Sequence, residues 1–530
     1  MKKASIFFLC LILLLSMAMT GCQSAATTTA TTANTTSATT AKATEATTTE
    51  PTASTKEFVE LEWYTPAGDC PDAQMVFDAL NVSLKDKINA KVNIHSVPIA
   101  DYGTKMTAVV GAGQACDIFT TDSEFPFANQ VAQGACLDIT KLLPIYAPDI
   151  MALLPEGMWA GASYKNAVYA IPTYKDNASL KGLQYNKTWA EKYQVTIPEW
   201  TSFSELEDEM YAVRAGMDKE GTYKDYIPVV GTTSIEPSFW FTYNKLISDL
   251  AVTTVTGVNS FAGQGDSDKV FCLYTTDEYK AYCHSMLKWV TDRILINKNT
   301  TPWGFHYEKG EVFSTTCDGW ADLPENFYSE DWKAQLVVKN PVVMTTSSVQ
   351  GAMNAIAIQS KNPERALMLL NIVNTDTPTA TLLRFGIEGE HYNRDAKGLI
   401  YFTDSKRNSD SSAYGYYQWY GIEWGNIFAM ELPASQNQNL WKAVKAYNEK
   451  ALVDKNLGFS TDVSKITNQV AACSAVVEEY RENLELGLYS DDAMVDSMLK
   501  EFTDKLKANG LEEVLAECQS QLTAWQAANK

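Results

Sequence analysis

The sequence predicts an α/β protein with a mostly parallel sheet, and three observations indicate this fold class. Apolar and polar residues alternate in segments 58–66 and 91–97, as they do in half-buried strands. A helical segment of about 72–89 separates them, and residues 104–122 predict a helix, a glycine turn and a short buried strand. Helices that alternate with strands connect parallel neighbours in one sheet. The last hundred residues have a helical pattern.

The N-terminus predicts export. Residues 6–19 form an apolar run behind two lysines, with the length of a signal peptide and too short to span a membrane comfortably. The run leads into Cys22 and resembles the lipobox of bacterial lipoproteins, in which the thiol takes a diacylglyceryl group and becomes the new N-terminus. Met19 departs from that pattern, because leucine is usual there. We expect a lipoprotein signal peptide at 1–21 and lipid on Cys22; the alternative is a secretory signal with an incidental cysteine.

Segment 22–57 predicts a lipid-anchored, disordered linker. Residues 23–56 are mostly Thr, Ala and Ser, which offer little to bury. A flexible coil of this length spans roughly 30–35 Å on average, enough to hold a folded body clear of a lipid surface. We therefore expect the protein on the extracellular face of the cell membrane, attached through the lipid on Cys22. Glycosylation of the linker and passage through a cell wall both stay open.

Two helices of the body have clear start signals. Ser202 is followed three residues later by Glu205, which predicts a capping box. Asn362 is a capping residue type, and Pro363 suits the first helical position. Apolar residues at helical spacing follow each start: Phe203, Leu206, Met210 and Val213 in one helix, and Ala366, Leu369, Leu370 and Val373 in the other.

Charge and cysteine content limit the partners and cofactors. The chain carries a net charge of −21, or −23 without the two lysines of the signal peptide, which excludes nucleic acid as a partner and favours a neutral or cationic ligand. No later apolar run has the length of a membrane span. The cysteines of the body are widely and irregularly spaced without a CxxC pair, so we expect zero to two disulfides, no metal and no cofactor. They are Cys70, Cys116, Cys136, Cys272, Cys283, Cys317, Cys473 and Cys518.

Four segments of the body resemble those of the extracellular solute-binding proteins of ABC importers, the large sugar-binding group that includes the maltose-binding protein. Residues 169–193 are similar to the first crossing between lobes, and 236–246 to an aromatic helix start in the second lobe. Residues 307–323 are similar to a turn before a sugar-stacking tryptophan, and 353–373 to the return strand and helix of the first lobe.

A narrower resemblance is to the lipoproteins of this group with an extended C-terminal region, often labelled LplA-like. Its marks are segments 382–392, 447–466 and 509–525. The resemblance implies a type II periplasmic-binding-protein-like fold, with two α/β lobes joined by hinge strands and extra C-terminal helices. It implies a first lobe of 58–173 plus 340–400, and a second lobe of 174–339 plus 401–530 with the C-terminal helices.

The same resemblance implies the function. The protein is expected to capture a carbohydrate, in particular an oligosaccharide, in the cleft between the lobes and to deliver it to the transmembrane subunits of an ABC permease. It is expected to act as a monomer and to catalyse nothing. Segment 350–358, which varies among relatives, leaves the identity of the ligand open.

Aromatic rings that cover sugar faces, and polar groups that bind hydroxyls, are the expected site residues. Tyr64 lies at the end of the first predicted strand, and Asp122 and Glu124 follow another strand of the first lobe, where open α/β sheets bind ligands. By resemblance, Trp320 is the stacking tryptophan and Asp318 stands just before it. The remaining candidates are Tyr174 at the first crossing, Trp240 at the aromatic helix start, and Trp419 and Trp424 in the aromatic segment 413–426. The alternative for each aromatic residue is core packing, and for each carboxylate a turn or helix cap.

No enzyme motif stands out. HExxH, GxSxG and glycine-rich phosphate loops are absent from the sequence, so no catalytic residue is assigned. Glu388, Glu390 and His391 lie together in "GIEGEHY", where a structural turn is favoured over a metal site. Two other functions stay open: a surface glycoside hydrolase or lyase, which would need a carboxylate pair in the cleft, and a binding protein for a peptide or another solute on the same fold.

Overall fold

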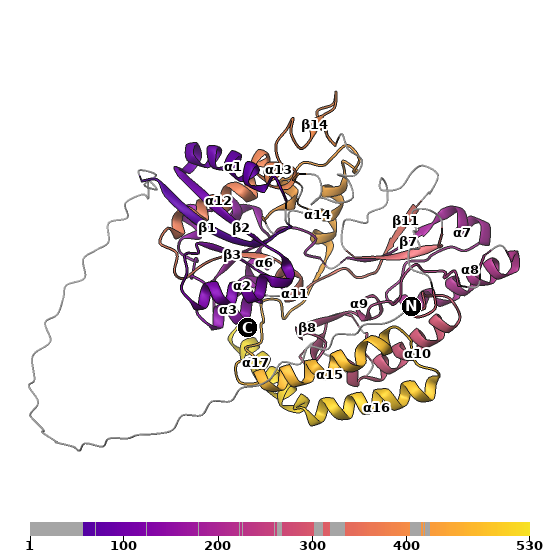
Figure 1. Ribbon diagram of the computed structural model, residues 1–530. Helices are drawn as coiled ribbons and strands as arrows, with labels where there is room; N and C mark the ends of the chain where they lie inside the picture. Colours follow the sequence, from indigo (N-terminus) through magenta and orange to yellow (C-terminus); the bar gives the residue numbers. More distant parts are fainter. Residues whose placement is uncertain are drawn as a thin grey trace, which may run out of the picture. The chain divides into compact units, whose positions relative to one another are not determined.

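The computed structural model describes residues 57–529 apart from 69, 123–124, 179, 222, 225, 259, 262–267, 302–310, 319–333, 403–414, 417 and 419–423 (Figure 1). The chain divides into two units, Met1–Pro51 and Thr52–Lys530, and the second contains all of the described residues. The predicted signal peptide, the predicted lipidation site Cys22 and the Thr-rich segment 23–56 lie outside the described residues, as do Glu124, Trp320 and Trp419.

A five-stranded sheet, in the order β2-β1-β3-β13-β6, forms the centre of the first lobe. Its strands are β1 (Val59–Pro66), β2 (Ala90–Val97), β3 (Ile118–Thr121), β6 (Ala170–Pro172) and β13 (Met353–Ile356). β1 runs parallel to β2 and β3, which confirms the pairing expected from the strand–helix alternation. The return strand β13 instead runs antiparallel to both of its neighbours, so only half of the sheet is parallel.

Helices cover both faces of this sheet (Figure 1). Alternate residues of β1 point to opposite faces, and the apolar residues on each face pack against a different set of helices. Trp63 packs in the cluster that contains helices α1 and α12, and Tyr64 packs in the cluster that contains α2 and α3. The elements of this lobe are α1 (Ala73–Ile88), α2 (Ile99–Gly111), α3 (Phe127–Ala132), α4 (Leu143–Tyr146), α5 (Pro148–Leu153), α6 (Glu156–Gly161), β4 (Ser163–Tyr164), β5 (Ala167–Val168), α12 (Pro363–Thr375), α13 (Thr377–Phe385), β14 (Asn393–Arg394) and β15 (Ile400–Tyr401).

The second lobe is built on a three-stranded antiparallel sheet, β10-β7-β11, with an aromatic core. Its strands are β7 (Lys181–Asn186), β10 (Ser314–Asp318) and β11 (Ala334–Val338), with a hairpin of β8 (Tyr243–Ile247) and β9 (Ala251–Thr254). Its helices are α7 (Lys187–Tyr193), η1 (Phe203–Leu206), α8 (Glu207–Glu220), α9 (Pro237–Trp240), η2 (Leu273–Thr275) and α10 (Asp277–Thr291).

The predicted apolar faces of two helices are confirmed, but neither predicted cap forms. Phe203, Leu206, Met210 and Val213, and likewise Ala366, Leu369, Leu370 and Val373, are all buried. Glu205 does not reach Ser202; it accepts hydrogen bonds from the backbone N–H and hydroxyl of Thr201, at 3.1 and 2.5 Å. The first turn is a 3₁₀ turn, which changes the geometry that a capping box needs. Asn362 holds the N-cap position without a side-chain bond, and Pro363 begins the helix as expected.

The last part of the chain divides between the lobes. Residues 424–457, with η7 (Ile427–Ala429), α14 (Leu440–Lys450) and β16 (Leu452–Val453), contribute to the core of the first lobe, although the sequence assigned everything after 401 to the second. β16 pairs with β12 (Val343–Met344), which belongs to the return crossing. Helices α15 (Thr467–Glu485) and α16 (Asp492–Ala508) pack against the aromatic core of the second lobe, and α17 (Leu511–Ala528) contacts both of these helices and β9.

Helix α15 meets α10 through Gly487, just beyond the α15 C-terminus. Gly487 has a left-handed φ of +59°, and a Cβ there would lie 2.5 Å from the carbonyl oxygen of Met286 and 2.8 Å from the amide nitrogen of Leu287. Both neighbours are backbone atoms of α10, so neither can rotate away. The sequence can therefore accept only glycine here without moving one helix off the other.

We expect Gly487→Ala to lower the free energy of unfolding by about 2–4 kcal/mol, from the left-handed backbone and the overlap together. Gly257→Ala is the matched control, because Gly257 also has a positive φ, +81°, but no atom within 4 Å of the added Cβ. Its cost should be about 1–2 kcal/mol. Urea unfolding of both variants measures the difference, and equal losses would show that the helix contact contributes nothing.

All eight cysteines of the body are buried, and none forms a disulfide with another described residue. This agrees with the lower limit of the expectation. Within residues 57–529, in the part that the structure describes, no helix has the length and hydropathy that a membrane crossing requires.

Candidate ligand-binding site

Two segments carry the chain between the lobes, and the second of them contributes to the candidate site. The first leaves β6 and enters β7 through residues 173–180, and the second leaves β11 and enters β12 and helix α11 (Thr346–Val349). The side-chain amide of Asn448 ties the first crossing to α14, since Asn448 Nδ2 donates to the Lys175 carbonyl at 2.6 Å and Oδ1 accepts the Ala178 N–H at 2.9 Å. The first crossing is thereby held by a helix of the first lobe.

A cavity of about 230 Å³ lies where the return crossing meets the second lobe. One wall comes from β7, α9 and β8, and the other from the return crossing and the start of α11. We name it the crossing cavity. Its lining residues are Lys181, Glu236, Ser238, Phe241, Thr242, Tyr243, Lys245, Lys339, Pro341, Val343, Thr345, Ser347 and Ser348.

The hydroxyl side of the crossing cavity is held in place by the N-terminus of α11. Thr345 caps the helix, because its hydroxyl accepts the Ser348 N–H at 3.3 Å while its own N–H donates to the Ser348 hydroxyl at 3.0 Å. The Thr345 and Ser347 hydroxyls lie 3.0 Å apart. Each hydroxyl both donates and accepts, which suits a polyhydroxylated ligand.

The opposite side of the crossing cavity is charged. Lys339 is 4% exposed, and its Nζ donates to the carbonyl oxygens of Ser238 and Phe241 at 2.8 and 2.6 Å. Lys181 is 9% exposed, lies 5.1 Å over the Phe239 ring, and has its Nζ 3.8 Å from Glu236 Oε2. Burial, with repulsion from Lys181, lowers the pKa of Lys339 to about 7 despite the opposing effect of Glu205.

A second cavity of about 540 Å³ adjoins the first. The two share Glu236, Ser238, Tyr243 and Lys245 as lining residues, and the second extends to α15 at the C-terminal region. Tyr243 donates to Asp249 Oδ1 at 2.8 Å, and burial and this carboxylate together raise the pKa of Tyr243 well above its ordinary value. The polar wall is therefore continuous from the return crossing to the C-terminal helices.

On the first lobe, buried polar side chains join the ends of three strands. The Thr120 hydroxyl lies 3.1 Å from the Thr65 hydroxyl and donates to Asn354 Oδ1 at 3.0 Å. Asn354 Nδ2 donates to the Trp424 carbonyl at 3.3 Å. This network fixes the edge of the sheet at which the predicted first-lobe residues stand.

Two of the predicted site residues, Tyr64 and Tyr174, are packed in the core clusters of the first lobe. Tyr64 stacks on His95, with ring centroids 4.2 Å apart, and Tyr174 packs edge-on against Phe428 at 4.7 Å. Asp122 accepts the Phe125 N–H at 2.9 Å, as expected of the turn alternative. All three residues lie near the same end of the sheet, but the rings of Tyr64 and Tyr174 pack in the core. Contact of any of the three with a ligand stays a prediction.

Two predicted tryptophans also lie in cores. Trp240 packs against Tyr282 and Trp289 in the second lobe. Trp424 is 0% exposed and packs against Trp63, so it presents no surface to a ligand in this conformation. The aromatic density of 413–426 came partly from core residues, since Trp424 completes the apolar face of the five-stranded sheet.

Asp318 ends β10 and holds the register position opposite Lys181 of β7. Neither Lys181 nor Lys339 was predicted as a site residue, because lysines at the ends of strands ordinarily face water. The available signal was weak: both lysines stand beside segments of apolar strand residues, in "SLKGLQY" and "LVVKNPVV".

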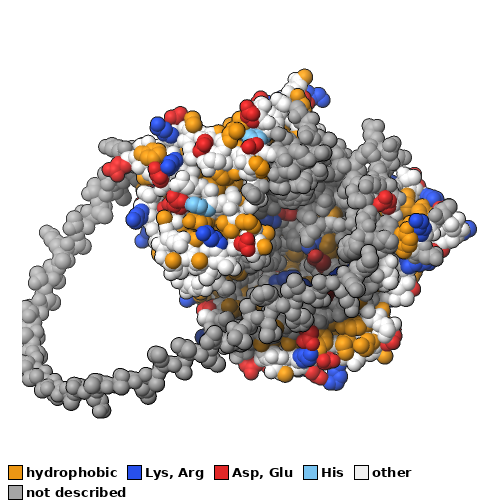
Figure 2. Space-filling view, viewed as in Figure 1, with side chains coloured by type: hydrophobic (Ala, Val, Ile, Leu, Met, Phe, Trp, Pro, Cys, Tyr) orange, Lys and Arg blue, Asp and Glu red, His pale blue; other side chains and the backbone are white. Residues whose placement is uncertain are grey.

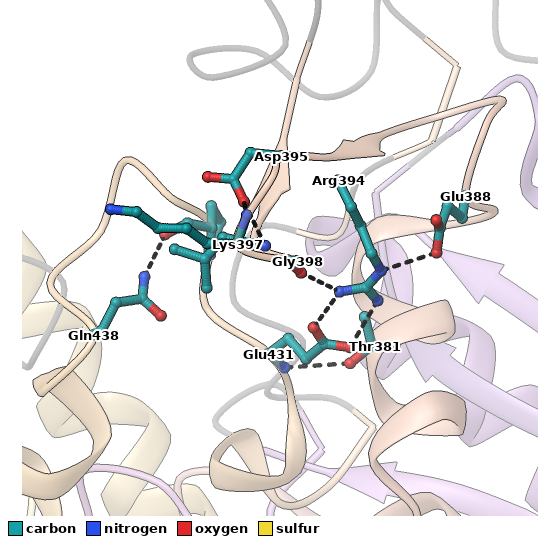
Figure 3. Close-up of polar contacts among 10 residues, drawn as sticks. Thr381, Glu388, Arg394, Asp395, Lys397, Gly398, Glu431 and Gln438 are labelled. Atoms are coloured by element: carbon teal, nitrogen blue, oxygen red, sulfur yellow. Dashed lines mark hydrogen bonds and ion pairs between the residues drawn. The ribbon is translucent and has the colours of Figure 1, made fainter.

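The metal alternative at "GIEGEHY" is replaced by a structural turn (Figure 3). Glu388 Oε2 accepts from Arg394 Nε at 2.9 Å, and Arg394 forms a two-pronged pair with Glu431, at 2.6 and 2.8 Å. His391 Nδ1 accepts the Ile387 N–H at 2.8 Å. Among the described residues, no group of His, Cys, Asp and Glu side chains has a geometry that could hold a metal ion.

Surface charge on the visible face is mixed. Acidic and basic side chains are interspersed over the described surface (Figure 2). The lysines of the crossing cavity are therefore a local feature in a chain whose net charge is −21.

Comparison with known proteins supports the resemblance. Residues 75–267 match the family model described as bacterial extracellular solute-binding protein, and residues 455–527 match a domain of unknown function, DUF3502. A carbohydrate ABC transporter substrate-binding protein of Streptococcus pneumoniae is 23% identical over 474 residues, which cover 86% of this chain and 88% of the relative.

Solved structures share the fold. The N-glycan transport solute-binding protein NgtS from Streptococcus pneumoniae has a TM-score of 0.73 at 20% identity, over 89% of this chain and all of that one. A solute-binding protein from Bifidobacterium longum infantis, described as HMO-binding and ABC-transporter-associated, has a TM-score of 0.59 at 17% identity, over 88% of this chain and 98% of that one. The two-lobe type II fold predicted from the sequence is thus confirmed. The family match over residues 75–267 and the shared fold make this chain similar to the bacterial extracellular solute-binding proteins.

Proposed function

We propose that the protein binds a carbohydrate, most simply an oligosaccharide, between its lobes and delivers it to an ABC permease without chemical change. The observation that carries the proposal is the hydroxyl-lined cavity at the return crossing of a two-lobe binding fold. Lobes joined by crossing segments can close over a ligand and reopen at the permease. The names of the similar proteins, an N-glycan transport protein and a carbohydrate ABC transporter substrate-binding protein, support the same ligand class.

The chemistry of the site suits sugars. Thr345, Ser347 and Ser348 offer hydroxyls that are already ordered by the cap of α11, so little entropy is lost when a ligand binds them. Aromatic candidates for the sugar faces, Trp320 and Trp419, lie outside the described residues and belong to this proposal. Micromolar affinity needs about 8 kcal/mol, which a few stacked rings and buried hydrogen bonds supply.

We also propose the location and the lobe boundaries. The family works outside the cell or at its membrane, and the lipobox-like sequence at Cys22 supports a lipid anchor there. Mass spectrometry of the mature N-terminus measures the diacylglyceryl group directly. The core clusters support lobe boundaries near residues 173 and 340, with 424–457 assigned to the first lobe.

Ligand binding should raise the melting temperature of the full-length protein in mild detergent. At a ligand concentration of one hundred times the Kd, the folded state gains about 2.7 kcal/mol. A panel of mono- and oligosaccharides, read by thermal shift and then by calorimetry, identifies the ligand. Chromatography of the ligand after incubation distinguishes the proposal from a glycoside hydrolase or lyase: the sugar should be recovered intact, and its consumption would contradict a binding role. Binding of peptides but of no sugar would favour the third function.

A further inference from the structure

A third cavity, of about 720 Å³, lies where the β4–β5 hairpin of the first lobe meets helix α17. We name it the α17 cavity. One wall comes from the end of α6 and the hairpin, and the other from residues 458–465 and 517–529. In the described part of the chain it shares no lining residue with the crossing cavity. Its volume is that of a site for a small molecule.

The two walls of the α17 cavity are joined by the protein itself. Gln350 Nε2 donates to the Gly161 carbonyl at 2.8 Å and to the Ser460 hydroxyl at 3.0 Å. The backbones of the walls also meet closely, since a Cβ added at Gly458 would lie 2.9 Å from the Ala160 carbonyl oxygen. A ligand that enters such a preformed cavity has little conformational entropy to remove.

Polar groups on the C-terminal wall hold one another in place. Gln521 Oε1 accepts the Asp462 N–H at 2.8 Å, and Gln521 Nε2 donates to the Asp462 carbonyl at 2.8 Å and to Glu517 Oε1 at 2.9 Å. Lys465 Nζ lies 3.1 Å from the same oxygen of Glu517. Both carboxylates therefore stand at fixed positions along the cavity, where each has lone pairs to offer.

An indole ring supplies the apolar part of the same wall. Trp525 packs against Phe459, with ring centroids 5.9 Å apart, beside a small core that contains Cys518 and Leu522. Phe459 is buried, whereas Trp525 is half-buried and borders the cavity. A flat ring held in this way can cover the apolar face of a sugar.

The hairpin supplies polar groups on the opposite wall. Lys165 and Asn166 form its turn, with φ values of +49° and +64°, and both are exposed. Tyr164 precedes them, and Lys165 Nζ lies 5.0 Å from the centroid of its ring. Within the described residues, the Tyr164 hydroxyl and the Asn166 side-chain amide have no hydrogen-bond partner, so both can donate to and accept from a ligand.

The lining of the α17 cavity has no net charge. It contains Lys165 and Lys465 against Asp462 and Glu517. Lys465 is paired with Glu517, and Lys165 acts on Asp462 from the opposite wall: hydrogen bonds from Ser464, together with Lys165 and Lys465, lower the pKa of Asp462. This balance favours a neutral ligand, because a charged one would meet no charge that lacks a partner.

We propose that the α17 cavity is a second carbohydrate-binding site, which takes a neutral disaccharide unit of a glycan. Trp525 would cover a face of one sugar ring, while Tyr164, Asn166 and the carboxylates of Asp462 and Glu517 would bind hydroxyls. A purely apolar molecule would leave these polar groups without partners. The inference goes beyond the proposed function, because this site lies apart from the crossing cavity and can be filled whether or not that cavity binds a sugar.

The test follows Trp525 itself, by fluorine NMR of the full-length protein in mild detergent with 5-fluorotryptophan in place of tryptophan. Trp525→Phe identifies the resonance, since it removes that signal. The probes are maltose, cellobiose, lactose and N,N′-diacetylchitobiose, titrated separately. At least one should shift the Trp525 resonance saturably, with a Kd of about 1 mM or tighter, as one stacked ring and a few hydrogen bonds allow.

Variants of the opposite wall show whether the shift reports direct contact. Tyr164→Phe removes only a hydroxyl, and Asn166→Gly removes an amide while it keeps the left-handed backbone. Each should weaken the affinity seen at Trp525 about threefold to tenfold. Tyr146→Phe is the matched control, because Tyr146 is a half-buried tyrosine of the first lobe that lines neither cavity; it should leave the affinity unchanged.

Ser347→Ala separates this site from the crossing cavity, which Ser347 lines. It should not change the affinity seen at Trp525; a loss equal to that of Tyr164→Phe would show that the shift is transmitted from the crossing cavity, and would overturn the second site. No saturable shift with any of the four disaccharides also overturns it, as does a shift that neither Tyr164→Phe nor Asn166→Gly weakens. A shift with the tripeptide Gly-Ala-Gly but with no sugar would overturn the ligand class. Each of these failures leaves sugar binding at the crossing cavity, measured by calorimetry, as a separate question.

Discussion

Replacement of Trp424 by alanine is expected to lower the free energy of unfolding by about 3–5 kcal/mol, the range for a large aromatic side chain removed from a core. Trp424 packs edge-on against Trp63, with centroids 5.4 Å apart at 89°, and against Phe77 at 6.3 Å. These rings lie between the five-stranded sheet and α1, so the cavity left behind would be enclosed by secondary structure that cannot collapse into it.

Urea unfolding, followed by circular dichroism, measures the loss for Trp424→Ala. Phe58→Ala is the control, because Phe58 stands just before β1 and is exposed; its effect should stay within about 0.5 kcal/mol. The same variants tested for sugar binding separate the two roles predicted for Trp424. Unchanged stability with lost binding would return Trp424 to the ligand site and contradict the core role.

Glu485→Gln is expected to stabilise the protein at pH 8 by about 2–3 kcal/mol. Burial raises the pKa of Glu485 from 4.5 to about 7; Arg481 opposes the shift and Asp249 adds to it. The Tyr279 hydroxyl donates to Glu485 Oε1 at 3.2 Å, and a glutamine oxygen can accept the same bond. The variant therefore resembles the protonated glutamate, which is the form that the buried site favours.

The sign follows from proton binding. Because the folded-state pKa of Glu485 lies above the unfolded one, the folded state binds more protons between pH 4.5 and 7. The contribution of Glu485 to the stability of the wild type is thus greatest below pH 4.5 and is lost as the pH rises through 7. The difference between variant and wild type should be near zero at pH 4.5 and reach its full value above pH 7.

Denaturant unfolding of the wild type and of Glu485→Gln from pH 4.5 to 8 measures this difference in the free energy of unfolding. Other titrating groups, such as the buried Asp454 with its raised pKa, contribute equally to both proteins and cancel in the difference. Glu482→Gln is the matched control on the same helix, because Glu482 is exposed and pairs with Lys298 at the surface. Its difference should stay small at every pH. A constant difference across the range for Glu485→Gln would contradict the shifted pKa.

Much of the fold was predictable because local pattern and tertiary structure agree over much of the chain. The segments with alternating apolar and polar residues form strands, Val59–Pro66 and Ala90–Val97. The buried faces of α8 and α12 were predicted from the spacing of their apolar residues. The capping box at Ser202 failed because Thr201, one residue earlier, offers Glu205 both an N–H and a hydroxyl. A sequence pattern does not show which of two neighbouring donors the turn will present.

The site was harder to predict, because burial depends on partners far away in sequence. Trp424 and Trp240 have the composition of a sugar-binding surface, yet each ring meets core residues from other elements. Lys339 becomes buried only because α9, about a hundred residues earlier, brings the carbonyls of Ser238 and Phe241 to its ammonium. Such tertiary contacts depend on the topology of the chain, which the spacing and composition of residues in the sequence do not reveal.

The pairing of β16 with β12 gives the two halves of the molecule a third tether. From β16 the chain continues through Gly458, whose N–H donates to the Thr346 hydroxyl at 2.9 Å, and on into α15. A hinge made of two connecting segments lets the lobes twist as well as bend, whereas three segments side by side resist twisting. The two lobes should therefore open along one arc, so that each opening exposes the same pair of facing surfaces.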